Sequence, residues 1–228
     1  MKKILGTALI VVFSCLNANA EITVGISGNA GLLSATGKET FNSKTQTKSD
    51  DMGIAYLSGF AEIHLPMNIG PGKFRVGASI VPYALESEAT TSERAAGEYA
   101  ANNNGEEYTP KAAFNQNVQV DLKDLRTAYL SYHVEQGFFI KGGVIEADLI
   151  TNEVLGSGSS YPNAALDGSF YGVGFDRDIP NGIFVRGEVT VTEFDNIKLS
   201  STGSTNAKTI DITGLSGTNI AISVGKTF

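Results

Sequence analysis

The sequence predicts an all-β fold, a single transmembrane barrel of eight antiparallel, up-and-down strands. Three observations predict this fold. Apolar residues alternate with small or polar ones in eight segments, the connections between the segments alternate between short and long, and aromatic residues gather beside the short connections. Most of the segments come close to the length of about 9–11 residues that a tilted strand needs to cross a membrane.

The alternation is clearest at the end of the chain, where Ile220, Ile222, Val224 and Phe228 share one face of the last segment. Small or polar residues occupy the other face, which is the period of two that a strand shows when its two faces have different surroundings. The same reading predicts strands at about 21–32, 53–66, 73–84, 120–134, 138–148, 168–177, 182–193 and 220–228.

The connections divide into two kinds. Three short ones, at about 66–72, 135–137 and 178–182, contain the Gly and Pro residues that make tight turns. Four long, polar ones cover about 33–52, 86–117, 149–167 and 194–217. Because successive connections of an up-and-down barrel lie at opposite rims, we expect all four long loops at one rim. Within the second, Ser92 to Ala101 is rich in Ala and Glu, which predicts a short helix.

The N-terminus predicts export. Lys2 and Lys3 precede the apolar run 4–13, and Ala18-Asn19-Ala20 follows, which is the pattern of a cleaved signal peptide. The run is too short for a membrane helix, which needs about 20 residues. We therefore expect a signal peptide over 1–20 and a barrel domain over 21–228. The alternative is acylation of Cys15, as in a lipoprotein.

Cleavage after Ala20 removes the only cysteine, so disulfides cannot hold the exported domain together. It also leaves 15 basic and 24 acidic residues, a net charge of −9. This charge argues against binding to nucleic acid or to anionic lipid through bulk electrostatics.

If the apolar face of each strand contacts lipid, the opposite face lines the lumen and carries charges of both signs. An eight-stranded barrel has an interior that side chains just fill, and opposed charges in it can satisfy each other. We therefore expect a structural charge network, not a pore lining, formed by Glu62, His64, Arg75, Lys141, Asp176, Arg186 and Glu188.

The outward face carries aromatic residues beside the short connections. Aromatic rings prefer the membrane interface, where girdles of them mark transmembrane barrels. The predicted periplasmic girdle consists of Phe74, Tyr132, Phe138, Phe175 and Phe228.

The last strand, with apolar residues alternating back from the terminal Phe228, resembles the terminal signal of bacterial outer-membrane proteins. Lys226 departs from that pattern, and its long side chain is able to reach the interface. With the signal peptide and the loop pattern, the chain resembles the eight-stranded barrels typified by the OmpA barrel and OmpX. The resemblance implies a place in the outer membrane of a Gram-negative cell, contact with outer-membrane lipid, and insertion by the barrel-assembly machinery that reads Ile220, Ile222, Val224 and Phe228.

The chemistry of the chain favours a structural or surface-interaction role through the long loops, with a surface ligand that the sequence does not identify. The alternatives are a narrow porin-like channel for small solutes or ions and, further from the pattern, a soluble lipocalin-like barrel or an enzyme. We expect no enzymatic activity, because the two histidines, His64 and His133, lie near the short turns and no catalytic motif is present. We also expect a monomer with no cofactor and no metal.

Overall fold

The computed structural model describes residues 21–41, 44–87, 90–94, 114–154, 160–202 and 209–228. The expected signal peptide therefore lies outside the described residues. Eight strands form the barrel: β1 (Ile22–Phe41), β2 (Lys44–Ile69), β3 (Gly72–Ile80), β6 (Phe114–Val134), β7 (Phe138–Val154), β8 (Ala164–Ile179), β9 (Ile183–Phe194) and β11 (Thr209–Thr227). Three short strands are added to it: β4 (Leu85–Glu86), β5 (Thr90–Arg94) and β10 (Ile197–Ser200).

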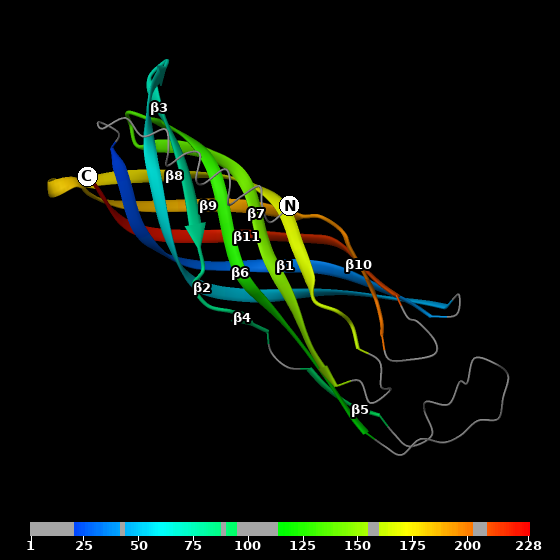
Figure 1. Ribbon diagram of the computed structural model, residues 1–228. Helices are drawn as coiled ribbons and strands as arrows, with labels where there is room; N and C mark the ends of the chain where they lie inside the picture. Colours follow the sequence, from blue (N-terminus) through cyan, green and yellow to red (C-terminus); the bar gives the residue numbers. More distant parts are fainter. Residues whose placement is uncertain (1–20, 42–43, 88–89, 95–113, 155–159, 203–208) are drawn as a thin grey trace, which may run out of the picture.

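The eight strands close into a ring. They pair antiparallel in the order β1-β2-β3-β6-β7-β8-β9-β11, and β11 pairs with β1 again from Thr23–Thr227 to Thr40–Thr209. In Figure 1 the first and last strands, blue and red, accordingly lie side by side. The predicted fold class, an eight-stranded antiparallel barrel, is confirmed. In the described part of the chain, no helix is long and apolar enough to cross a membrane.

Tight turns join the strands at one rim. Between β2 and β3 only residues 70–71 intervene, between β6 and β7 residues 135–137, and between β8 and β9 the 3-10 turn Pro180–Gly182. Gly70, Gly137 and Asn181 have positive φ values of 65°, 91° and 71°. Tight reversals often need this left-handed conformation, and glycine and asparagine adopt it most easily.

At the opposite rim the strands run further than the sequence predicted. Most of the expected loop 33–52 is strand, because β1 continues to Phe41 and β2 begins at Lys44. The expected loops 149–167 and 194–217 are shortened in the same way by β7, β8, β10 and β11. The extensions of β1 and β2, over residues 36–40 and 45–49, are polar on both faces, so they pair through the backbone without the alternation that marks a half-buried strand. Those of β7, β8, β10 and β11 carry the apolar residues Leu149, Leu166, Leu199 and Ile212.

Two further expectations were wrong. The third strand ends at Ile80, not at residue 84, because Pro82 has no amide to donate to a ladder. The helix expected over Ser92 to Ala101 is not formed at its beginning, where residues 92–94 belong to β5 and pair with β6. Residues 95–101 lie outside the described part of the chain.

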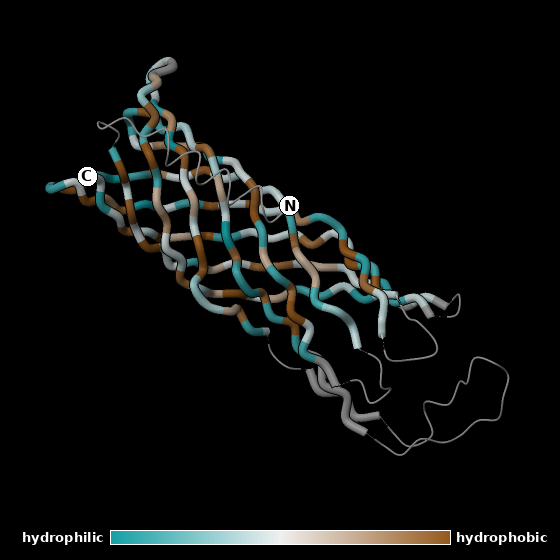
Figure 2. Tube along the Cα trace, viewed as in Figure 1, coloured by the Kyte–Doolittle hydropathy of each residue, from teal (hydrophilic) through white to brown (hydrophobic). Residues whose placement is uncertain are grey.

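The outside of the barrel is an apolar belt. Large apolar side chains such as Ile26 and Ile222 are 64% and 68% exposed, and they alternate along the strands with buried neighbours. In Figure 2 brown and teal segments alternate along the strands of the barrel wall. Where its strands are paired, a closed sheet with an apolar outside satisfies its backbone groups internally, which is what a lipid environment demands.

Candidate functional site

The lumen at the short-turn end is closed by a buried arginine held between two carboxylates. Arg186 on β9 donates from Nη2 to Glu62 Oε2 on β2 at 3.0 Å and from Nε to Asp176 Oδ1 on β8 at 2.7 Å. The side chains are 3%, 0% and 8% exposed. Strands β2 and β9 are not neighbours in the ring, so the Arg186–Glu62 contact crosses the interior. Two-pronged contacts of this kind are the strongest form of charged hydrogen bond.

Three more side chains complete this cluster, which we call the charged plug. Arg75 Nη1 lies 3.4 Å from Glu62 Oε2 and 3.2 Å from Asp176 Oδ2. Tyr129 donates its hydroxyl to Glu62 Oε1 at 3.0 Å, and His133 Nδ1 lies 3.1 Å from Asp176 Oδ2. The plug therefore joins β2, β3, β6, β8 and β9 across the lumen.

Aromatic rings enclose the guanidinium of Arg186. Its Cζ atom lies 5.3, 4.9 and 5.2 Å from the ring centroids of Phe60, Phe139 and Phe184. A side chain at Gly174 would meet the Phe139 ring at 2.4 Å, so glycine is required there for the close approach. The rings cover the guanidinium and add cation–π attraction.

The other predicted network residues make no ion pair with the plug, although Lys141 Nζ lies 4.9 Å from the centroid of the Tyr129 ring. Lys141 Nζ contacts Glu188 Oε1 at 2.6 Å, as a separate buried pair. His64 lies toward the short-turn rim, where it contacts Glu21 at 2.8 Å and Thr23 at 3.0 Å. Sequence reasoning left His133 and Tyr129 out of the network, although both lie on the inward face of their strand.

The lumen at the long-strand end is apolar, which the sequence analysis did not predict. Side chains that come mainly from β6, β7 and β8 pack into one buried cluster, which contains Val81, Leu122, Leu125, Tyr129, Ile145, Ala147, Leu149, Tyr161, Leu166, Phe170 and Leu199. Partly buried residues of β1, β2, β9 and β11 pack against it. Large apolar side chains thus gather in this half of the lumen, and the buried ion pairs gather in the half that holds the plug.

A cavity of about 860 Å³ lies against this cluster, and we call it the apolar chamber. Leu122, Leu149 and Leu166 form part of its wall, together with Leu33, Ile212 and residues of β10. On one side it is bounded by residues 50–55 of β2 and by residues 83–87. A volume of this size is within the range of pockets that hold small organic molecules.

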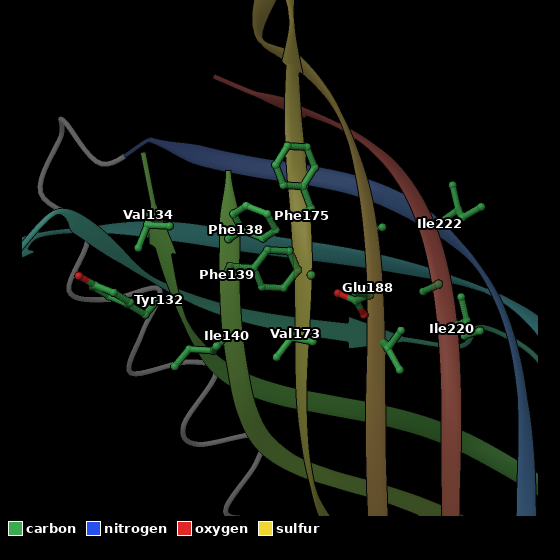
Figure 3. A pocket seen from close by; sticks show the side chains of 14 residues that line it. Tyr132, Val134, Phe138, Phe139, Ile140, Val173, Phe175, Glu188, Ile220 and Ile222 are labelled. Carbon is green, nitrogen blue, oxygen red and sulfur yellow. The ribbon is translucent and has the colours of Figure 1, made fainter. Parts of the chain in front are cut away.

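The predicted girdle residues lie on the outside at the short-turn end. Phe138 and Phe175 pack edge to face with their centroids 5.0 Å apart, and Phe74 and Tyr132 are separated by the same distance. Lys226 Nζ lies 4.9 Å from the centroid of Phe228. Beside these rings is a hollow of about 800 Å³ (Figure 3), where exposed residues of the apolar belt such as Ile140, Val173 and Ile222 face acyl chains.

Within the described ranges, no cluster of three or more His, Cys, Asp or Glu side chains has a geometry suited to a metal ion. The charges of the plug are engaged with each other. The chamber offers mainly apolar contacts, with Asp50, Asp51 and Glu86 on the side of β2 and of residues 83–87. The arrangement is suited to binding an apolar molecule and to blocking the passage of water and ions.

Comparisons with solved structures identify the class of protein that this fold defines. The chain is similar to the outer membrane protein OprG from Pseudomonas aeruginosa, with a TM-score of 0.56, 15% identity, and coverage of 92% of this chain and 96% of that one. It is also similar to the outer membrane protease OmpT from Escherichia coli, with a TM-score of 0.39, 11% identity and coverage of 92% and 97%.

A further similarity is to Ail, the attachment invasion locus protein of Yersinia pestis, with a TM-score of 0.34, 9% identity and coverage of 90% and 99%. No protein-family model and no curated protein sequence matches the chain. The chain is an eight-stranded β-barrel of the bacterial outer-membrane class. Its closed ring, apolar belt and fold are those of a barrel that resides in the outer membrane.

Proposed function

We propose that the barrel takes small apolar molecules into the apolar chamber from the outside and releases them sideways into the lipid. The observation that carries this proposal is the division of the lumen. One half offers an apolar cavity of about 860 Å³, and the other half is filled by buried, mutually paired charges. An apolar molecule gains from leaving water for the chamber, and it gains nothing from entering the plug.

The side of the chamber supports release into lipid. The last pair between β2 and β3 toward the long-strand end is Gly59–Ile80, whereas β2 itself runs on to Lys44. Among the described residues, no strand pairs with this edge of β2 beyond Gly59. Leu57 and Leu32, both 62% exposed, show that the apolar belt reaches this level of the wall.

A binding experiment tests the proposal. The barrel in lipid nanodiscs is titrated with 1-aminoanthracene, whose fluorescence rises in apolar surroundings, and empty nanodiscs are subtracted. Ala35 lines the chamber. We expect the indole of Ala35→Trp to fill part of the chamber and to raise the dissociation constant of the dye roughly tenfold. Ser34→Trp, on the opposite face of β1, is the matched control and should bind like the wild type.

Absence of saturable binding by the wild type would contradict the proposal, as would equal binding by the two variants. The chain contains no tryptophan. Each variant therefore carries a single indole, whose emission reports on correct folding.

A surface-interaction role is the second candidate. The hairpin of β1 and β2 continues for several residue pairs past Ser34–Asp51, beyond the apolar belt. In Figure 1 it projects from the barrel together with β10 and the beginning of β11. Rigid strands that hold loops away from a membrane form a scaffold on which binding commonly resides. A pull-down would test that role by comparing the wild type with a variant whose hairpin is shortened by paired residues of β1 and β2. Neither role requires catalysis.

A further inference from the structure

Tyr83 lies where the wall of the barrel is incomplete. It follows Pro82, just after β3 ends, and its hydroxyl accepts a hydrogen bond from the amide of Leu57 at 2.6 Å. Amides of alternate residues point to the same edge of a strand, so Leu57 provides the first edge donor beyond Gly59, which belongs to the last β2–β3 pair. Tyr83 thus supplies from a side chain the hydrogen bond that the missing strand would have made.

Tyr83 also separates two cavities. On one side it bounds the apolar chamber of about 860 Å³. On the other it bounds a hollow of about 560 Å³ on the lipid-facing surface, lined by Gly28, Ala30, Leu57, Ile220 and Ile222 among others. Ala55 is the other residue that borders both. The phenol ring, 45% exposed, therefore stands between the chamber and the lipid.

We propose that Tyr83 is the gate of the sideways path and sets its specificity. The proposal rests on the function proposed above and deepens it. When the ring swings away, the Leu57 amide loses its acceptor at a level where lipid provides no replacement, which is costly. A passing molecule that carries its own acceptor, such as a carbonyl or ether oxygen, takes over this hydrogen bond. The preferred substrate class is therefore an apolar molecule with one hydrogen-bond acceptor.

The test compares two probes of nearly equal size and shape, 2-acetylnaphthalene, which has a carbonyl, and 2-ethylnaphthalene, which has none. The barrel is reconstituted in vesicles with a lipopolysaccharide outer leaflet, and the initial rate of probe entry is followed with a quencher in the bilayer. The wild type should transfer the acetyl probe faster than the ethyl probe.

Tyr83→Phe removes the hydroxyl and keeps the ring. We expect it to speed entry of both probes roughly fivefold, the effect of one hydrogen bond of ordinary strength. The preference for the acetyl probe should persist, because the Leu57 amide still gains an acceptor only from that probe. Tyr83→Ala should speed both. Tyr171→Phe, at an exposed tyrosine of the belt on β8, is the matched control and should leave both rates unchanged.

The outcomes separate the two proposals. Unchanged entry rates in Tyr83→Phe, or equal entry of the two probes in the wild type, would overturn the gate and leave the chamber standing if aminoanthracene binding is intact. No saturable binding in the wild type would overturn the proposed function itself. The heat-dependent gel shift of folded barrels checks that each variant is folded. The entry rates of the two probes in Tyr83→Ala are a second, independent test of the gate.

Discussion

Arg186 is the residue on which the charged plug depends most. It binds Glu62 and Asp176, which are both buried. Arg186→Met would leave two carboxylates without their main partner, and breaking a buried pair in this way costs about 3–5 kcal/mol. We expect a loss of this size in the free energy of unfolding, measured by urea denaturation in lipid vesicles.

Arg177 provides the control for this measurement, because it is the neighbour of Asp176 on β8 and is exposed. Arg177→Met should change the free energy of unfolding by less than about 1 kcal/mol, as for an exposed charge. Equal effects of the two substitutions would show that the plug contributes no special stability.

At this scale the sequence indicated which faces carry charge, but not which charges meet. Strand parity assigns Glu62, Arg75 and Asp176 to the inside, where the structure has them. Parity contains no information on partners across the lumen, so it gave no reason to separate Glu188 from Arg186. It is Lys141 that contacts Glu188, past the small residues of the intervening strand β8.

At the scale of the element, the end of β11 combines closure of the barrel with the expected assembly signal. Phe228 exchanges backbone hydrogen bonds with Ile22 at 2.9 and 3.2 Å, while its side chain is 69% exposed. Deletion of Phe228 would therefore also remove two hydrogen bonds. Phe228→Ala keeps them and isolates the side chain.

We expect purified Phe228→Ala to refold into detergent almost normally, because one rim phenylalanine contributes about 1.5–3 kcal/mol at most. Its recovery in the outer membrane of cells should fall sharply if the assembly machinery reads this ring. Phe138→Ala, at another exposed girdle position, is the control. Equal membrane recovery of both variants would count against the signal.

The extension of β1 beyond the belt gives a second prediction for an element. Thr36 to Thr40 pair with β2 on one side and with β11 on the other, although they lie in a segment expected as a loop. Hydrogen exchange should therefore be slow for these amides, on the scale of minutes to hours. Exchange as fast as in an unfolded peptide would show that this segment is a loop, as the sequence analysis expected.

The sequence analysis ended these strands early for a physical reason. A strand is recognised by a contrast between its faces. The contrast disappears where both faces are polar, and it reverses where the inward face becomes apolar and the outward face charged. Thr36 to Thr40 illustrate the first case. Residues 145–149 of β7 show the reversal, because Ile145, Ala147 and Leu149 are apolar on the inward face while Glu146 and Asp148 on the other face are charged.

For the whole molecule, the sequence predicted the barrel, its closure and one half of its interior. The apolar chamber could not be predicted, because it forms only when inward residues of β1, β6, β7, β8 and β11 meet around one cavity. Each of these residues alone is an ordinary apolar residue of a strand. The gap beside β2 likewise depends on the early end of β3, which follows from a single proline.

The central claim is that the lumen is closed at the charged plug, so that molecules in the chamber leave sideways and not across the membrane. Recording of ion current from the purified wild-type barrel in planar lipid bilayers tests this claim most directly. The account predicts no steady current above that of the protein-free membrane. A steady, ion-selective current from the wild type would contradict it, and would establish the barrel as a narrow channel.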